Sequence, residues 1–389
     1  MADFRFSAAA EAFRAEVIAW LGQLDPATLA AHADPSDLTG LGEQFERALH
    51  AEAGERGWLD LPAELQAVFN FEAARADAPV VDTAMTLIGG AVARFAVNDH
   101  HREVLADMAA GRVEGCVAYT EPGAGTDLAA LGGRATRDGD GWVLHGTKTL
   151  VTGAHKAEWC VTVLRTDAAG PARDALSMFL VDLRLPGIQV RRLPTLNGWT
   201  LGEIEFDGAR VGPEALLGTE GAGWRQMGMA LAAERSGTFW LGFARHALDL
   251  LGGYVCTTAR DGVLLADDPL VVDEIGRLET AWASADLLSR RALWSQIDDT
   301  DVAASTAMAK VVTTELLQEI AQAATEIAEA EGTVWAPLFS GDHIPGAAAG
   351  GRFAWEYLER VHATIGAGVN EVHRDAIATG VLGRTTRWT

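Results

Sequence analysis

The sequence has no long apolar run and no basic leader. None of its apolar stretches approaches the roughly 18 to 20 uninterrupted residues that a membrane-spanning helix needs. The opening residues, MADFRFSAAAEAFRAEV, carry acids among the apolar residues, whereas a secretory signal has a basic segment followed by an apolar core. We therefore expect a cytoplasmic protein without a membrane anchor.

Basic residues are also scarce. The chain has 31 Lys and Arg against 54 Asp and Glu, which gives a net charge of −23. A field of this sign repels phosphate backbones and anionic lipid surfaces. Binding to nucleic acid or to a membrane surface is therefore excluded from the expected functions.

The chain has too few cysteines for a disulfide framework. The three cysteines, Cys116, Cys160 and Cys256, lie far apart with no C-x-x-C spacing. This pattern argues against structural disulfides and against a cysteine zinc site, so buried free thiols are expected. His100 and His101 are adjacent and lack the i, i+4 spacing of a helical metal pair, so no metal site is predicted.

What the chain does have is length and apolar content. Its 389 residues are 49% hydrophobic, which is enough for two or three domains with sizeable cores. After Ser7, a plausible helix cap, apolar residues recur at helical spacing; they are Phe13, Val17, Trp20, Leu21 and Leu24. We predict an α-helical domain over residues 1–114.

The pattern changes to short β-rich runs near residue 115. The runs are 142–145, 161–164, 178–181, 188–190 and 204–206, separated by Gly, Pro and Asp. Because no helix-length segment lies between them, they favour an antiparallel barrel or sandwich over a parallel α/β sheet. We predict a small antiparallel β domain over 115–220 and disfavour a Rossmann domain.

Helical periodicity returns in the last part of the chain. Apolar residues at 275, 278, 282 and 285 share one helix face, and an alanine-rich stretch runs from 305 to 330. A Gly/Pro-rich connection at 332–351 precedes a last helix near 371–382. We predict a helical bundle over 221–389, and therefore an α+β fold with the order helix, β, helix.

The strongest local motif is Tyr119-Thr-Glu-Pro-Gly-Ala-Gly-Thr-Asp127. Its small residues expose backbone N–H groups, and the hydroxyls of Thr120 and Thr126 suit a polar or phosphorylated ligand. Taken alone, the motif favours a Gly-rich connection between strands, because it lacks the third glycine of a dinucleotide fingerprint.

The motif belongs to an ordered series. It is followed by GWVLHGTKTLVTGA, LLGTEGAGW, AAERSG and TIGAGVNEVHRDAIATGVLG. Together these segments resemble the acyl-CoA dehydrogenase family over nearly the whole chain. The resemblance implies FAD between the β domain and the C-terminal helices, with an acyl thioester across the isoalloxazine. It also implies α,β-dehydrogenation, in which a carboxylate removes the α-proton and the β-hydrogen leaves as hydride.

The family's catalytic base has two possible positions. Many members use the Glu of a Tyr-Glu-Gly-Thr motif, but the matching stretch here reads Gly366-Ala367-Gly368-Val369. A subset places its Glu on an earlier helix immediately before an arginine, and Glu234-Arg235 matches that pattern. The resemblance therefore implies Glu234 as the base, whereas an ordinary solvated or ion-paired Glu is the alternative. The Ala367 backbone N–H can still donate to the thioester oxygen.

The resemblance also assigns binding residues. Tyr119 and Thr120 match positions near the flavin ring, Gly125 and Thr126 match the pyrophosphate site, and Thr152 matches a position near N5. Leu150 stands where the family usually has Trp. The remaining candidates concern the substrate: Arg235 for the carrier end of the thioester or a structural ion pair, and Phe239 and Trp240 for the acyl pocket.

Two motifs for the outer half of FAD are altered. The family's Arg-x-x-Phe-Gly and Gln-x-x-Gly-Gly regions, which hold a neighbouring subunit's cofactor, read here as 257–262 and 326–330. Arg260 and the backbone near Gly368 are the candidates that could replace them. Glu326 and Glu329 disfavour a diphosphate because they carry the same charge.

Several features of the reaction stay open at this point. The thioester carrier is CoA or an acyl carrier protein, and the resemblance implies an electron acceptor such as an electron-transfer flavoprotein. It also implies a homodimer or homotetramer. The altered outer motifs leave a half-site or structural subunit of a heteromer as one alternative. A flavin-dependent oxidase or monooxygenase on the same fold is the other.

Overall fold

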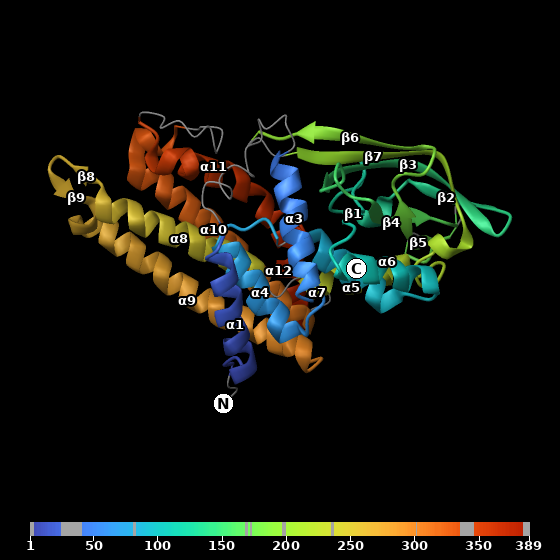
Figure 1. Ribbon diagram of the computed structural model, residues 1–389, viewed down its shortest axis with the longest axis horizontal. Helices are drawn as coiled ribbons and strands as arrows, with labels where there is room; N and C mark the ends of the chain where they lie inside the picture. Colours follow the sequence, from blue (N-terminus) through green and yellow to red (C-terminus); the bar gives the residue numbers. More distant parts are fainter. Residues whose placement is uncertain are drawn as a thin grey trace. The chain divides into compact units, whose positions relative to one another are not determined.

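The chain forms two compact units, which are described separately. The helical unit comprises residues 1–46, 61–81 and 235–389, and the sheet unit comprises residues 47–60 and 82–234. The computed structural model describes residues 4–24, 41–80, 83–167, 170–171, 173–196, 200–234, 237–300, 302–334 and 346–383. The order helix, β, helix is confirmed (Figure 1). The domain boundaries after residues 114 and 220 stay predictions.

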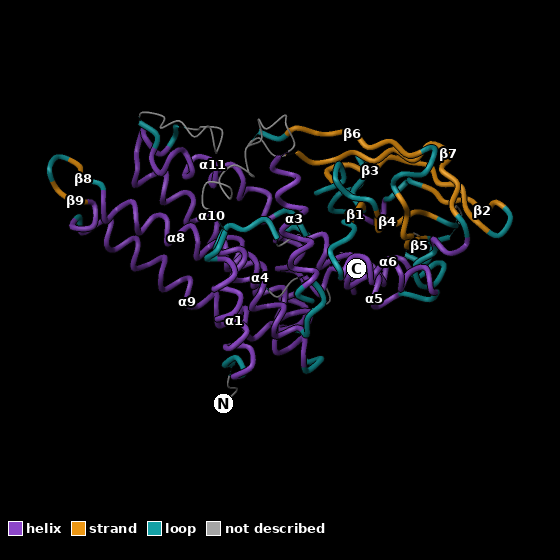
Figure 2. The backbone as a smooth tube through the Cα atoms, viewed as in Figure 1, coloured by secondary structure: helices purple, strands orange, loops and turns teal. Residues whose placement is uncertain are grey.

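The sheet unit contains one seven-stranded sheet, drawn in orange in Figure 2. Its strands are β1 (Gly115–Ala118), β2 (Arg134–Asp138), β3 (Gly141–Thr152), β4 (Trp159–Arg165), β5 (Leu176–Asp182), β6 (Ile188–Pro194) and β7 (Thr200–Val211). All five predicted β-rich runs fall within these strands. The order is β1-β4-β2-β3-β7-β6, and β5 pairs with β4.

Most strand pairs are antiparallel, as predicted, but two pairs are not. β1 pairs with β4 in parallel over four residues, and β2 meets β4 in parallel at Arg134 and Arg165. These pairs join strands that are distant in sequence, so the short spacing between consecutive runs could not indicate them.

Alternation along the strands gives the sheet two apolar faces. Met178 and Leu180 of β5 pack in a cluster with helix residues such as Ile88 and Met108, while Phe179 and Val181 face a second cluster among the strands. The helices of this unit are α5 (Thr83–Phe95), α6 (Asp99–Ala109) and α7 (Gly223–Glu234), with short turns η1 (Leu128–Ala130) and η2 (Pro213–Ala215).

The helical unit is built on three long helices. They are α8 (Thr238–Thr257), α9 (Pro269–Ile297) and α10 (Val302–Gly332), which run side by side in Figure 1. Leu241, Leu248 and Leu251 lie on one face of α8 and pack with Leu317 and Ile320 of α10. The predicted helical stretch at 305–330 is therefore confirmed.

Shorter elements complete this unit. They are α1 (Ala8–Leu21), α4 (Ala63–Arg75), β8 (Ala259–Arg260), β9 (Val263–Leu264), η3 (Leu265–Asp267), η4 (Ala348–Gly351), α11 (Arg352–Glu359), η5 (Arg360–Thr364) and α12 (Asn370–Leu382). The Ser7 hydroxyl accepts from the Ala10 N–H at 3.1 Å, which confirms the predicted cap. Helix α3 (Leu41–Glu55) crosses from one unit to the other along the chain.

A buried ionic chain fixes α11 within the helical unit. Arg352 donates to both carboxylate oxygens of Asp77 at 2.7 and 3.0 Å, and Glu356 accepts from both Arg352 and Arg360. Burial alone would raise the pKa of the Asp77 carboxyl, but the charge and hydrogen bonds of Arg352 outweigh it and hold the pKa well below its usual range. This chain anchors the segment that leads into residues 366–369.

Two sequence expectations concern exposure. Cys116 and Cys160 are buried free thiols as predicted, but the prediction was wrong for Cys256, which is exposed near the end of α8. Helical periodicity buries one face of α8 and leaves this position outside it. None of the helices in the described ranges is both long and apolar enough to cross a membrane.

Candidate functional site

The 119–127 loop follows β1 and is closed on itself. Glu121 and Ala124 exchange backbone hydrogen bonds of 2.9 and 3.0 Å across the turn. Tyr119 is buried in the core, whereas Gly125 and Thr126 are exposed. The loop therefore presents a glycine backbone and a hydroxyl to solvent from a fixed base, as a phosphorylated ligand requires.

A buried ion pair holds this loop. The Lys148 ammonium, fully buried on β3, donates to the Glu121 carboxylate at 2.7 Å and to the carbonyls of Val163 and Tyr119 at 2.8 and 3.3 Å. Burial lowers the pKa of the Lys148 ammonium, and the nearby Glu121 charge opposes that shift. The pair ties the loop to strands β3 and β4.

Two glycines complete the carboxylate's environment. The Glu121 oxygens accept from the Gly132 N–H at 2.7 Å and from the Gly133 N–H at 3.0 Å. A Cβ on Gly133 would lie 2.7 Å from a Glu121 oxygen and 2.9 Å from Leu164, so glycine is required for this approach. The Glu121 side chain is thus satisfied by an ammonium and by backbone amides.

A β-bulge brings the end of β3 against the same loop. The Thr149 N–H turns to the Thr120 carbonyl at 2.9 Å, and the β3–β7 register shifts between Lys148 and Val151. Leu150 at the bulge has a left-handed backbone with φ of 57° and is exposed. The exposed Thr152 ends the strand. The Thr149–Thr120 hydrogen bond therefore joins the two segments that carry six predicted cofactor residues: Tyr119, Thr120, Gly125, Thr126, Leu150 and Thr152.

In the helical unit, the 366–369 loop is held through its backbone. Ala367 and Gly368 have φ of 54° and 95°. The Gly368 carbonyl accepts from the buried Lys310 ammonium at 2.9 Å, and the Ala367 carbonyl lies 3.2 Å from His373 Nε2. Lys310 also donates to the Asn370 side chain at 2.7 Å. Left-handed alanine is uncommon, and these contacts hold it.

The two predicted pocket aromatics lie near this loop. The Phe239 and Trp240 rings meet edge to face with centroids 5.1 Å apart, and the Trp240 ring is 5.6 Å from that of His362. The His362 carbonyl accepts from the Gly366 N–H at 2.8 Å. Trp240 is buried in the helical core and Phe239 is half-buried beside it. An apolar group could contact this aromatic wall.

Arg260 lies at the other end of α8. Eighteen residues of helix separate Thr257 from Phe239, which is roughly 27 Å. The Arg260 guanidinium donates to the Ile327 carbonyl at 2.6 Å and pairs with Glu329 at 3.0 Å. Its charge is therefore already matched within the chain. With Glu326 and Glu329 on α10, this corner does not fit a diphosphate.

The two remaining candidates are Glu234 and Arg235. Glu234 is the last residue of α7, and its side chain lies outside the described residues, as does all of Arg235. Their roles stay predictions.

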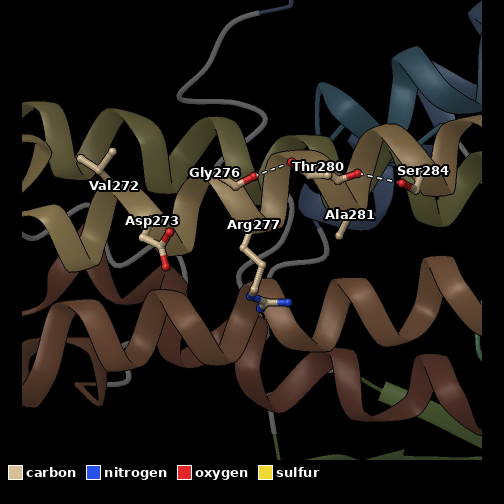
Figure 3. A pocket seen from close by; sticks show the side chains of 7 residues that line it. All are labelled: Val272, Asp273, Gly276, Arg277, Thr280, Ala281 and Ser284. Carbon is tan, nitrogen blue, oxygen red and sulfur yellow. Dashed lines mark hydrogen bonds between the residues drawn. The ribbon is translucent and has the colours of Figure 1, made fainter.

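One open groove lies elsewhere on the helical unit. It has a volume of about 660 Å³ along α9, and its lining residues are Val272, Asp273, Gly276, Arg277, Thr280, Ala281 and Ser284 (Figure 3). The Thr280 and Ser284 hydroxyls donate to carbonyls of their own helix, and Arg277 pairs with Glu274 and Glu319. The groove shares no residue with the candidate site.

The site residues therefore fit one half of the expected cofactor. The 119–127 loop and the end of β3 offer exposed hydroxyls and a glycine backbone suited to the flavin and its pyrophosphate, whereas the Arg260 corner is unsuited to the outer half. Sequence reasoning missed the residues that hold the two loops, which are Lys148, Glu121, Lys310, Asn370 and His373. A signal was present for Lys148, because it shares the inward parity of Trp142 and Leu144 on β3.

Comparisons with known proteins show which family the chain resembles over most of its length. The acyl-CoA dehydrogenase middle domain model matches residues 116–209, and the acyl-CoA dehydrogenase C-terminal domain model matches residues 221–382. The chain is 34% identical over 298 residues to acyl-CoA dehydrogenase IpdE1 of Mycobacterium tuberculosis, covering 70% of this chain and 73% of that one.

Solved structures agree over the full length. The Tcur3481-Tcur3483 steroid ACAD superposes with a TM-score of 0.87 at 26% identity, covering 99% of this chain and 100% of that chain. The ChsE4-ChsE5 complex from Mycobacterium tuberculosis gives a TM-score of 0.84 at 26% identity, with the same coverage.

Proposed function

This chain belongs to the acyl-CoA dehydrogenase family, and we propose that it dehydrogenates an acyl thioester at Cα–Cβ with Glu234 as the base and FAD as the cofactor. It is accordingly a flavin-dependent oxidoreductase. The observation that supports the proposal best is the 119–127 loop, which the Lys148–Glu121 pair holds against the end of β3 with Thr126 and Thr152 exposed.

Each part of the reaction has a candidate in the chain. The 119–127 loop and the end of β3 would hold the flavin, which would supply a hydride acceptor for the β-hydrogen and a route for the electrons to an external acceptor such as an electron-transfer flavoprotein. The Glu234 carboxylate takes the α-proton. The Ala367 backbone N–H donates to the thioester oxygen, which gains negative charge as that proton leaves. Phe239 and Trp240 line the acyl end, and Arg235 contacts the carrier end.

The thioester carrier and the acyl group follow from the relatives' names. The curated relatives are named acyl-CoA dehydrogenases, which favours CoA over an acyl carrier protein. One structural neighbour is named a steroid ACAD, which favours bulky polycyclic acyl groups. Other relatives are named short-chain specific, which favours short acyl groups instead. A substrate panel therefore needs both classes of CoA thioester.

The assembly is an oligomer, either a homodimer or homotetramer or a complex with a homologous subunit. The Arg260–Glu329 pair and the Glu326 carboxylate at the outer cofactor corner favour a second role, in which this chain is one subunit of a heteromer. The ChsE4-ChsE5 neighbour is itself named as a complex of two chains. Sedimentation combined with flavin counting separates the two assemblies. One FAD per chain supports the homo-oligomer, and weak flavin binding that rises on co-expression with a homologue supports the heteromer.

The decisive experiment is anaerobic reduction with a dye as acceptor. Reconstituted protein should show flavin absorbance, gain heat stability from the bound FAD, and bleach on addition of an acyl-CoA. Glu234→Gln keeps the side-chain shape and should slow flavin reduction by about 10² to 10⁴. Glu220→Gln, an exposed glutamate of the sheet unit, is the matched control and should leave the rate unchanged.

Other outcomes point elsewhere. Wild-type reduction by Glu234→Gln would assign the base to another residue, and partial rescue by adding Ala367→Glu would place the 366–369 loop beside the α-carbon. Turnover only with oxygen would identify an oxidase or monooxygenase. Failure to bind flavin alone or with a homologue would defeat the proposal.

A further inference from the structure

The 366–369 loop has two peptide groups whose carbonyls are both held from the buried side. His373 Nε2 lies 3.2 Å from the Ala367 oxygen, and Lys310 Nζ lies 2.9 Å from the Gly368 oxygen. Both side chains are almost fully buried, at 2% and 1% exposure. Each belongs to a helix, α12 or α10, so the two contacts fix the loop to rigid elements.

Because the peptide group is planar, these contacts also determine where the neighbouring N–H groups point. In a planar trans peptide the carbonyl and the following N–H point in opposite directions. The His373 contact therefore directs the Gly368 N–H away from α12, and the Lys310 contact directs the Val369 N–H away from α10. The φ of Ala367 is 54°, and a non-glycine residue in this left-handed region has only a narrow range of ψ, so the fixed plane also constrains the direction of the Ala367 N–H.

The same contacts strengthen two of these donors, the N–H groups of Gly368 and Val369. A peptide whose carbonyl accepts a hydrogen bond in a low-dielectric environment becomes a better donor at its N–H, because the bonds polarise one another. A buried ammonium is the strongest such partner a side chain offers. Lys310 is itself held by the Asn370 side chain, which donates to Thr314 at 3.2 Å and to Glu315 at 2.9 Å.

We propose that Lys310 and His373 are positioning residues for the thioester oxygen: by binding the carbonyls of Gly368 and Ala367, they preorganise the loop's N–H groups to polarise the substrate carbonyl. This inference rests on the proposed function, because it places the thioester at this loop. It adds a role for two residues that contact no reacting atom. Preorganised donors of this kind act without reorganisation during the reaction.

The test uses paired variants on the full-length protein. Lys310→Met removes the ammonium with little change in length. His373→Leu removes the imidazole donor, and His373→Gln keeps an N–H near the Nε2 position as the conservative variant. Thr306→Val is the matched control, because Thr306 is buried on α10 one turn before Lys310 and its hydroxyl bonds only within that helix in the described structure.

The first readout needs neither substrate nor flavin turnover. Amide hydrogen exchange of the peptide covering 366–369 should accelerate at least tenfold in Lys310→Met and His373→Leu, relative to the exchange of β4, and should not change in Thr306→Val. An unchanged loop in a folded Lys310→Met protein would overturn the inference even if the wild-type enzyme proved inactive.

The second readout is spectroscopic. A 3-thiaacyl-CoA has sulfur in place of the β-carbon, so it can be polarised at the α-carbon but cannot lose a β-hydride. Wild-type holoenzyme should give a long-wavelength charge-transfer band with it. The band should weaken in Lys310→Met and His373→Leu and largely return in His373→Gln.

The third readout compares the rate of flavin reduction with KM. Flavin reduction at saturating acyl-CoA should fall by about 10² in Lys310→Met, with a smaller change in KM, because the lost interaction grows in the transition state. Wild-type reduction and a full band in that variant would refute the positioning role. A wild-type protein that binds flavin but is reduced by no thioester would instead refute the proposed function, and the exchange result would still decide the holding role of the two residues.

Discussion

The 119–127 loop and the 366–369 loop are both held by buried contacts, but the groups that make those contacts differ. Each is fixed by a buried lysine, and each is associated with a non-glycine residue of left-handed backbone: Leu150 beside the first loop and Ala367 within the second. Lys148 holds the first loop chiefly through the Glu121 carboxylate at 2.7 Å, with a longer contact of 3.3 Å to the Tyr119 carbonyl. Lys310 holds the second through a backbone carbonyl.

The difference explains which residues each loop can lose. A loop held through its backbone does not depend on a carboxylate at position 367, so alanine can stand there while the same contacts hold the loop. A loop held through Glu121 has no such freedom, because removing that carboxylate leaves the Lys148 charge buried without its partner. Catalytic function can therefore move away from the second loop more easily than cofactor binding can leave the first.

Breaking the ion pair should have the largest effect. Lys148→Met leaves the Glu121 carboxylate buried and should cost about 3–5 kcal/mol of unfolding free energy, together with FAD affinity. Lys148→Met/Glu121→Gln should cost less, because no charge is left buried. Urea unfolding measures both. Arg102→Met, which removes an exposed partner of Asp99, is the control and should change stability by no more than about 0.5 kcal/mol. If Lys148→Met proved as stable as this control, the first loop would not depend on the Lys148–Glu121 pair, and the two loops would not differ in this respect.

The second prediction concerns pH and the anchor before the 366–369 loop. Because the folded-state pKa of Asp77 lies below its unfolded value, its contribution to stability is full above about pH 5 and is lost as the pH falls below about 4. The difference in unfolding free energy between wild type and Asp77→Asn should be roughly 2–3 kcal/mol at neutral pH and should shrink towards pH 3. A difference that stayed constant over this range would show that Asp77 is not ionised in the ion pair.

Smaller effects are expected at the left-handed residues. Leu150→Gly removes the steric cost of φ near 57° but adds chain entropy to the unfolded state, so a net gain of about 0.5 kcal/mol is expected. Thermal unfolding of the protein without flavin would detect it. A loss of more than about 1 kcal/mol would mean that the exposed leucine packs against a neighbour.

The smallest effect should follow from Ala367→Asn. Asparagine tolerates the left-handed region, and Lys310 and His373 hold backbone carbonyls of this loop, so stability should stay within about 0.5 kcal/mol of wild type. Unfolding measurements check this, with Glu121→Ala as the contrasting variant. A large loss in Ala367→Asn would show that the second loop also depends on side-chain identity.

Much of the fold was predictable because the spacing of apolar residues along the chain indicates local secondary structure. Helical spacing placed α1, α9 and α10, and β-rich runs placed the strands from β3 to β7. The parallel pairing of β1 with β4 was not predictable, since Cys116 and Cys160 become partners only through long-range assembly. Cys256 was placed in the core because cysteine is usually buried, but its position on α8 decided otherwise.

The candidate site was predictable only where residues act through their own motif. Motif matching found Thr126 and Thr152, whose exposed hydroxyls lie on neighbouring segments of the sheet unit. It did not find Lys310, a single lysine among alanine, valine and threonine on a buried helix face, because its partner is a carbonyl 58 residues away. Nor could it show that Arg260 is already paired with Glu329, since that contact depends on where α10 ends.

The exposed Cys256 gives the chain a natural labelling site. Cys116 and Cys160 have no exposed surface, so a maleimide dye added to the folded protein should react at Cys256 alone. This thiol lies four residues before Arg260, at the corner where a neighbouring subunit's cofactor would be expected. A fluorophore there could report by quenching whether another copy of this chain or a homologous subunit docks at that corner, without any engineered substitution.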